Sequence, residues 1–123
     1  MDIVNEKIFL MIITKDDIYN ITKENTKINY EKLTLILKDF LNSNNLKLED
    51  IQKIYVNRGP GSFAGIRNSL SIVKAINVAR NIDYYCYSLE DFKDQKDVKY
   101  EDIPNLCDKF KIKKNLIKPI YLS

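Results

Sequence analysis

The alternation of apolar and polar residues near the start of the chain predicts a β-hairpin. Residues 7–13 form an apolar run rich in isoleucine, and residues 18–22 alternate between apolar and polar side chains. The polar sequence at residues 14–17, Thr-Lys-Asp-Asp, separates the two runs and is typical of a turn. We therefore expect two antiparallel strands here.

A helical period of apolar residues follows the hairpin. One face of the segment 30–41 carries Leu33, Ile36, Leu37, Phe40 and Leu41. This spacing predicts a helix that covers a core and ends within the asparagine-rich residues 42–45. Leu35 falls on the opposite, polar face of the helix, which makes it a candidate contact for a partner protein.

The segment 63–80 predicts a second helix, and this one has two apolar flanks. The first flank carries Phe63, Ile66, Leu70 and Val73, and the second carries Gly65, Ile72, Ala75, Ile76 and Ala79. Arg67, Ser71 and Lys74 form a polar seam between the flanks. Two apolar flanks require two packing partners, so the second partner is either another part of the domain or another chain.

Short strands are predicted on both sides of this helix, at residues 53–57 and 82–87. Ser88, with Asp91 three positions later, predicts the start of a further helix. The remaining segments are expected to be a loop at 94–99, a short helix within 100–111 and an extended piece at 118–122. This order predicts an α/β unit with a mixed sheet and flanking helices.

A glycine-rich turn at residues 58–62 joins the predicted strand to the second helix. Gly59 and Gly61 permit a positive φ or a close approach, Pro60 stiffens the turn, and Ser62 is placed to cap the helix. The start of the helix could also hold an anion. The glycine spacing fits neither a phosphate-binding P-loop nor a dinucleotide fingerprint, so a purely structural turn and an anion site both stay open.

Composition excludes several classes of protein. With 123 residues, 45% of them hydrophobic and 30% charged, the chain has the size and balance of one globular domain. Its longest apolar stretch, residues 8–13, is too short to span a bilayer, and its start does not have the pattern of an export signal. We expect a cytoplasmic protein without a membrane contact.

The chain contains few side chains that could act as nucleophiles or metal ligands. The chain has no histidine, and its two cysteines, Cys86 and Cys107, form no CxxC pair. A zinc site and a histidine-activated nucleophile are therefore not expected. The net charge is +3, and the lysines of residues 109–118 form either a weak contact for polyanions or an ordinary solvated surface.

The sequence of residues 58–67, RGPGSFAGIR, resembles the GPGSFTGLR signature of the TsaB family, with Ala64 in place of threonine and Ile66 in place of leucine. Residues 87–90 and 119–122 are similar to two further family segments, so the resemblance covers residues 2–92 and the last few. It implies a single actin-like or RNase H-like (ASKHA) lobe. The implied signature residues, with a possible anion contact, are Gly59, Pro60, Gly61, Ser62, Phe63, Gly65 and Arg67.

The chain departs from the family pattern at three places. Family members begin with an apolar strand that leads into an Asp-Thr-Ser turn. This chain keeps the aspartate of that turn as Asp2 and lacks most of the strand. We therefore expect either a misassigned start or a truncated strand. The family's His-Ser at the first helix is replaced around Asn29 and Tyr30. Most of the second lobe is absent, which divides the chain into a TsaB-like N-terminal lobe, 1–92, and a second-lobe remnant, 93–123.

The resemblance also implies a function. A TsaB protein is a non-catalytic subunit that pairs with a TsaD-like transferase, and a TsaE-like ATPase joins them to place threonylcarbamoyl on adenosine 37 of tRNA. The implied partner interface here is Leu35, Ile66, Leu70, Val73 and Lys74. The resemblance implies no catalytic residue, metal or cofactor in this chain. It implies contact with ATP and tRNA only at the level of the complex. The alternatives are a small ATP-binding protein of the same fold and a remnant that pairs with itself as a homodimer.

Overall fold

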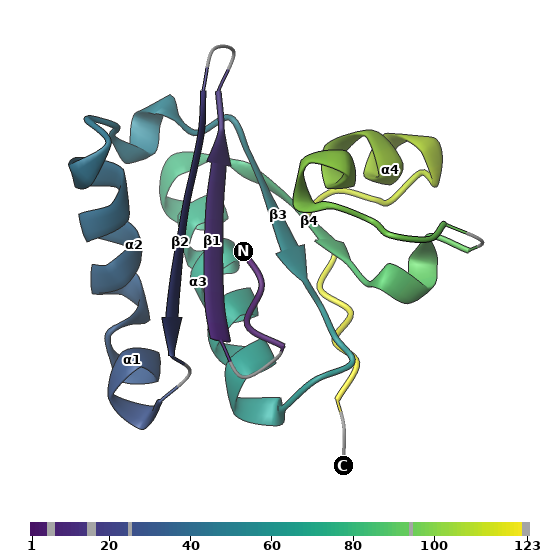
Figure 1. The fold of residues 1–123 in the computed structure, drawn as a ribbon, viewed down its shortest axis with the longest axis horizontal. Coiled ribbons are helices and arrows are strands. Elements are labelled where there is room, and N and C mark those ends of the chain that lie inside the picture. Colours follow the sequence, from purple (N-terminus) through teal and green to yellow (C-terminus); the bar gives the residue numbers. More distant parts are fainter. Residues whose placement is uncertain (5–6, 15–16, 25, 94, 122–123) are drawn as a thin grey trace.

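A β-hairpin opens the structure, a computed structural model that describes residues 1–4, 7–14, 17–24, 26–93 and 95–121. Strands β1 (Lys7–Ile13) and β2 (Ile18–Glu24) are antiparallel, with Lys7 opposite Glu24 and Ile13 opposite Ile18 (Figure 1). The predicted hairpin is confirmed, and β2 runs two residues further than expected. In the predicted turn, the Thr14 amide donates to the Asp17 carbonyl at 2.8 Å, while residues 15 and 16 lie outside the described residues.

The predicted helix at 30–41 is two helices, α1 (Lys27–Glu31) and α2 (Leu33–Ser43). Lys32 separates them with a non-helical backbone (φ −101°, ψ 13°). The asparagines end α2 as expected, because the Asn44 side-chain amide donates to the Phe40 carbonyl at 2.9 Å. Leu35 points away from the core and is 50% exposed, in agreement with its predicted position.

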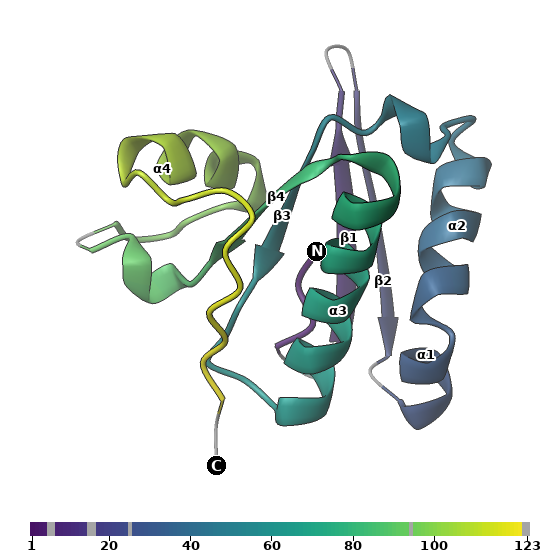
Figure 2. The same ribbon diagram turned by 180° about the vertical axis from the view of Figure 1, so that it is seen from behind.

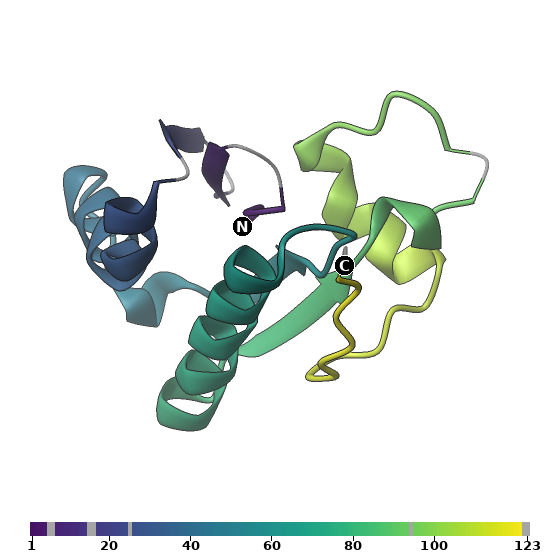
Figure 3. The same cartoon turned by 90° about the horizontal axis from the view of Figure 1, so that it is seen from below.

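The next unit is a pair of parallel strands joined by a long helix. Strand β3 (Lys53–Asn57) and helix α3 (Phe63–Arg80) have the predicted bounds, and β4 (Asp83–Tyr87) begins one residue later than expected. Side chains alternate between the faces of the pair, as strand geometry requires. Val56 and Cys86 face α3, while Tyr55 and Tyr85 face the opposite side, where α4 (Ile103–Lys109) lies (Figure 3).

Beyond β4 the regular structure is short. The predicted helix start at Ser88 is confirmed as a cap, but it begins only one 3-10 turn, η2 (Leu89–Asp91). A second turn, η3 (Tyr100–Asp102), leads into α4, and the chain then runs back in extended form beside β4 and the glycine-rich turn (Figure 2). Leu122, in the predicted extended end, lies outside the described residues. In the part of the chain that is described, no helix has the length and apolar character to cross a bilayer.

The α/β class is confirmed, but the strands form two small sheets instead of one mixed sheet. One sheet is β1–β2 and the other is β3–β4, and the segment at Met1 and Asp2 lies between them (Figure 1). Asp2 pairs with Phe9 of β1, and Met1 exchanges hydrogen bonds with β3. The alternation of side chains shows which residues form strands, but not which strand edges pair with each other. The prediction of one mixed sheet was therefore wrong.

The chain itself covers most of the first flank of α3 and part of the second, in which Ala75 and Ala79 are exposed. Ile66, Leu70 and Val73 pack on the β3–β4 pair, whereas Ile72 packs in the core shared by the hairpin and α2. A third core joins Tyr87 and Phe92 to α4. This core contains residues on both sides of the predicted boundary between 92 and 93, and the division into two lobes stays a prediction.

Candidate functional site

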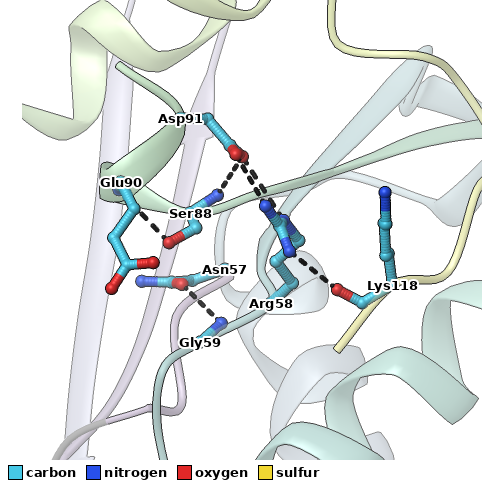
Figure 4. A network of polar contacts seen from close by, with 7 residues as sticks. All are labelled: Asn57, Arg58, Gly59, Ser88, Glu90, Asp91 and Lys118. Atoms are coloured by element: carbon cyan, nitrogen blue, oxygen red, sulfur yellow. Dashed lines mark hydrogen bonds and ion pairs between the residues drawn. The ribbon is translucent and has the colours of Figure 1, made fainter. Parts of the chain in front are cut away.

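The glycine-rich turn is anchored by a buried asparagine at the end of β3. The Asn57 side chain accepts a hydrogen bond from the Gly59 amide at 2.9 Å (Figure 4). It also donates to the Asp2 carboxylate at 3.2 Å. Only 4% of Asn57 is exposed, so its polar atoms depend on these partners. The first residues and the turn are thereby joined through one side chain.

The two glycines of the turn are needed for close approach. Gly59 has φ +117°, and a Cβ atom built on it would lie 2.1 Å from the Ile120 carbonyl oxygen. A Cβ atom on Gly61 would lie 2.7 Å from the Cβ of Val4. The turn is therefore packed between the first residues of the chain and its returning extended segment, and only glycine fits at either position.

The extended segment forms part of the site. The Ile120 amide donates to the Arg58 carbonyl at 2.8 Å, and the Gly61 amide donates to the Ile120 carbonyl at 3.3 Å. The ring of Tyr121 packs on that of Phe63, the first residue of α3, with 4.9 Å between their centroids. Residues 120–121 thus cover one side of the turn.

Arg58 connects three parts of the chain. Its guanidinium contacts the Asp91 carboxylate at 2.6 Å and 3.3 Å, and donates to the Lys118 carbonyl at 2.9 Å (Figure 4). Asp91 also accepts the Ser88 amide at 2.8 Å. Since both charged side chains are largely buried, this bidentate pair is a structural clamp and not a solvated surface contact.

We expect Arg58→Met to destabilise the fold by roughly 2 kcal/mol, because it leaves the largely buried Asp91 carboxylate without its countercharge. Urea unfolding measures the loss. The matched control is Arg80→Met, which breaks the exposed pair with Glu49 at 3.2 Å and should cost less than about 1 kcal/mol. Equal losses for the two variants would show that the Arg58 pair is no clamp.

The amides of the turn are used inside the chain. Gly59 donates to Asn57, Gly61 to Ile120, and Gly65 to the Ser62 hydroxyl at 3.3 Å, which confirms Ser62 as the helix cap. These three donors are not directed at solvent. The anion contact inferred for the signature loop stays a prediction.

The other signature residues lie on the surface of the turn. Pro60 and Phe63 are exposed, and the Arg67 guanidinium lies over the Phe63 ring at 5.6 Å from its centroid. The structure therefore brings Phe63 and Arg67 together beside Tyr121. Gly65 is the exception, because it is buried within the first turn of α3.

The structure divides the five residues predicted to face a partner. Ile66, Leu70 and Val73 are at most 3% exposed and pack against β3 and β4, while Leu35 and Lys74 lie on the surface. A side chain inside the chain's own core cannot meet a partner across the surface. For the three buried residues the apolar pattern reflects packing within the lobe, and the contact through Leu35 and Lys74 stays a prediction.

Both thiols are poor nucleophiles in this fold. Burial raises the pKa of Cys86 and of Cys107 to about 12, which leaves almost no thiolate at neutral pH. The described residues bring no three histidine, cysteine or acidic side chains together as a metal site would require. The features that the turn region does offer are a rigid bend, an aromatic pair and an arginine clamp.

Sequence reasoning missed three residues of this site, namely Asn57, Asp91 and Tyr100. Tyr100 donates its hydroxyl to the Asp2 carboxylate at 2.9 Å across 98 residues of sequence. A signal existed for two of the three: Asn57 is the one amide side chain in the apolar strand 53–57, and Asp91 stands at the third position after a capping serine. Nothing local indicated Tyr100, because its partner is distant in sequence.

A hairpin, a parallel strand pair around a long helix, and a glycine bend between β3 and α3 define one lobe of the ASKHA type. The sequence comparisons agree. The family model "TsaD: tRNA N6-adenosine threonylcarbamoyltransferase" matches residues 24–88, more than half of the chain. The chain therefore belongs to this family, as a member of its TsaB/YeaZ branch.

Individual relatives show how much of the family protein is present. The tRNA threonylcarbamoyladenosine biosynthesis protein TsaB of Buchnera aphidicola is 29% identical over 75 residues, which cover 61% of this chain and 34% of that protein. The structure of YeaZ from Pseudomonas aeruginosa matches with a TM-score of 0.65 at 20% identity, over 71% of this chain and 41% of that one. A second structure, described as similar to peptidase YEAZ from the same organism, matches equally well over 40% of its length. The chain thus aligns with less than half of each relative.

Proposed function

We propose that this chain is a non-catalytic subunit that binds and supports a TsaD-like transferase in the threonylcarbamoylation of adenosine 37 of tRNA. Its membership of the TsaB/YeaZ branch is the observation that carries the proposal. The side chains available for chemistry agree with a supporting role, because the chain has no histidine and both thiols have a pKa of about 12.

The exposed apolar side chains of the helices supply a surface for the partner. Ile28 of α1, Leu35 of α2 and Val78 of α3 are 63%, 50% and 78% exposed. Seen from behind, α3 lies in front of the strands and α2 lies beside the hairpin (Figure 2). Burial of several such side chains stabilises a complex by about 25 cal/mol per Å² before association costs, which is enough for micromolar binding.

The test is co-expression of the chain with the TsaD-like subunit of the same organism. We expect the two proteins to co-purify and Leu35→Asp to weaken binding at least about tenfold, because a charge replaces an apolar contact in a desolvated interface. The matched control is Leu89→Asp, the same change at a 56% exposed position in η2, away from the helices. It should bind like the unchanged chain.

The binding assay is paired with an activity assay, which measures threonylcarbamoyladenosine in tRNA made by the transferase with and without the chain. We expect product to depend on the chain and to fall with Leu35→Asp. Unchanged binding by the Leu35 variant would show that the interface lies elsewhere on the chain. A transferase that neither binds the chain nor responds to it would end the proposal, and a chain found only as a homodimer by size exclusion would favour self-pairing.

A further inference from the structure

A line of positive charge follows the chain from the end of α4 toward the glycine-rich turn. Residues 109–118 contain no acidic residue and five lysines, all with exposed side chains: Lys109, Lys111, Lys113, Lys114 and Lys118. The net charge of the whole chain is +3, so the residues outside this segment sum to a negative charge. The excess of positive charge is therefore concentrated in a segment that lies outside residues 24–88, which the family model matches.

The backbone that carries these lysines is held in place. Ile112 packs against the core beside α4, and its amide donates to the Cys107 carbonyl at 2.9 Å. The backbone amide of Asn115 donates to the Tyr84 carbonyl at 2.7 Å, and its side-chain oxygen accepts the Tyr84 amide at 3.0 Å. Ile117 packs against the core between α3 and the β3–β4 pair. These anchors fix the segment beside β4, so the lysines between them extend from an ordered backbone.

Most of these amines have no countercharge. Among the described residues, Lys114 alone of the five forms an ion pair, with Asp83 at 3.6 Å. Arg58 contacts Lys118 through the backbone carbonyl, and the Lys118 amine lies outside the clamp (Figure 4). Exposed lysines without carboxylate partners attract polyanions, because no internal ion pair has to break when the polyanion binds.

An exposed aromatic pair lies at the end of the same segment. Tyr121 follows Lys118 by three residues, which is at most about 11 Å along the chain. Its ring packs on that of Phe63, and the Arg67 guanidinium lies over the Phe63 ring at 5.6 Å from the centroid. Both rings are exposed. Exposed rings beside cations are the kind of surface on which unpaired bases stack.

This combination fits a nucleic acid better than a membrane or an acidic protein. Membrane surfaces are bound by amphipathic helices that insert an apolar face. Residues 110–118 are all described and form no helix, and Leu116 is the one large apolar side chain that they expose. An acidic protein supplies charges for the lysines but no partner for the rings. RNA supplies both, with phosphates for the lysines and bases for the rings.

The lysine segment lies apart from the surface proposed for the transferase. α2, which carries Leu35, is at one end of the longest axis of the molecule, and α4, from which the segment starts, is at the other (Figure 1). The segment then runs past β4 on the face shown in Figure 2. A transferase bound at Leu35 would therefore leave the lysines accessible to an RNA.

We propose that residues 109–118 and the Phe63–Tyr121 pair form a surface that binds tRNA. The lysines contact backbone phosphates, and the rings stack on unpaired bases. The inference rests on the proposed function, which supplies the tRNA, but it concerns a surface separate from the transferase contact. In this role the chain holds the substrate as well as supporting the enzyme.

The first experiment measures binding of an unmodified tRNA transcript to the chain by fluorescence anisotropy, between about 50 and 200 mM salt. The test variant combines Lys111→Gln, Lys113→Gln and Lys118→Gln. We expect it to bind at least about tenfold more weakly at the lower salt concentration. The slope of log K against log salt should fall in magnitude by about 2 to 3, because three fewer counterions are released.

The matched control combines Lys23→Gln, Lys27→Gln and Lys38→Gln, three exposed lysines of β2, α1 and α2. It has the same net charge as the test variant and should bind tRNA like the unchanged chain. An equal loss in both variants would mean that net charge alone acts, and full binding by the test variant would mean that the lysine segment is not used. Either result would overturn the proposed surface.

The aromatic pair has its own variant, Tyr121→Leu, which keeps an apolar side chain against Phe63. We expect tRNA binding to weaken about fivefold or more with an unchanged salt slope, because stacking releases no counterion. Circular dichroism checks that the variant is folded. Unchanged affinity in the folded variant would remove the rings from the proposed surface.

Two other polyanions test the choice of RNA. Phosphatidylserine vesicles and polyglutamate are compared with the tRNA transcript at equal concentrations of negative charge. We expect tRNA to bind most tightly. Tighter binding of the vesicles would overturn the assignment in favour of a membrane, and tighter binding of polyglutamate would overturn it in favour of an acidic protein.

Co-purification with the TsaD-like subunit separates this inference from the proposed function. The triple lysine variant should still bind the transferase, because Leu35 is unchanged, and loss of that binding would assign the lysines to a protein contact and overturn the inference. A chain that binds the transferase but contacts tRNA without the lysines would refute the inference alone. A chain that binds tRNA through the lysines but never binds the transferase would support the surface and end the proposed function.

Discussion

Replacement of Gly59 by alanine should destabilise the fold by roughly 3 kcal/mol or more. Two costs add at this position. The backbone has φ +117°, which L-residues rarely adopt, and the new Cβ would lie 2.1 Å from the Ile120 carbonyl oxygen and 3.0 Å from a methyl carbon of Ile66. Relief requires the extended segment to leave the turn, with loss of the Arg58–Ile120 hydrogen bond. Chemical denaturation followed by circular dichroism measures the loss.

Gly61→Ala is the comparison variant for this prediction. Its Cβ also meets a close neighbour, at 2.7 Å from Val4 Cβ, but the φ angle of Gly61 lies outside the left-handed region. We therefore expect Gly61→Ala to lower the free energy of unfolding clearly, but by less than Gly59→Ala does. A Gly59 variant within about 0.5 kcal/mol of the unchanged protein would mean that the turn and residue 120 are not packed as described.

The stability of the 123-residue chain should rise by about 2 kcal/mol between pH 6 and pH 8. The Met1 amine has a pKa of about 6 in the folded state against 8.0 when solvated, because burial disfavours its charged form. Between these values the unfolded chain binds more protons than the folded one, so the free energy of unfolding increases with pH. Two pKa units correspond to about 3 kcal/mol in total, at about 1.4 kcal/mol each, and about 2 kcal/mol of this falls between pH 6 and pH 8. The penalty is complete well below pH 6 and absent well above pH 8.

This window is unusually free of other titrations. The chain contains no histidine, and burial raises the pKa of both thiols to about 12. Urea midpoints at several pH values measure the slope, and a chain with an acetylated Met1 amine is the control, since it has no proton to lose there. The same slope in the acetylated chain would assign the effect to other groups.

Sequence reasoning succeeded where the signals are local. The bounds of β3 and α3 were predictable because a glycine-proline bend separates the end of an apolar strand from a capping serine. The exposure of Leu35 followed from the helical period alone. The family signature lies in this same segment, so the strongest resemblance and the most predictable structure coincide.

The errors arose where distant residues meet. Periodicity could not show that Met1 and Asp2 would lie between two sheets, nor that Lys118 and Asp91 would share Arg58. The two flanks of α3 illustrate the same limit. A helical pattern shows that a flank is apolar, but only the tertiary fold decides whether the chain's own strands or another protein covers it.

The contacts between the glycine bend and residues 118–121 have a consequence for how the protein is made. Arg58 and Lys118 are separated by 60 positions, so the bend gains its last backbone partners only after everything between them has been synthesised. The hairpin and α3 are synthesised before residues 118–121. Closure of the loop between Arg58 and Lys118 is also slow compared with the formation of a local helix. A nascent chain therefore carries its family signature in an open, unfinished state for much of its translation, and the signature region becomes native among the last parts of the molecule.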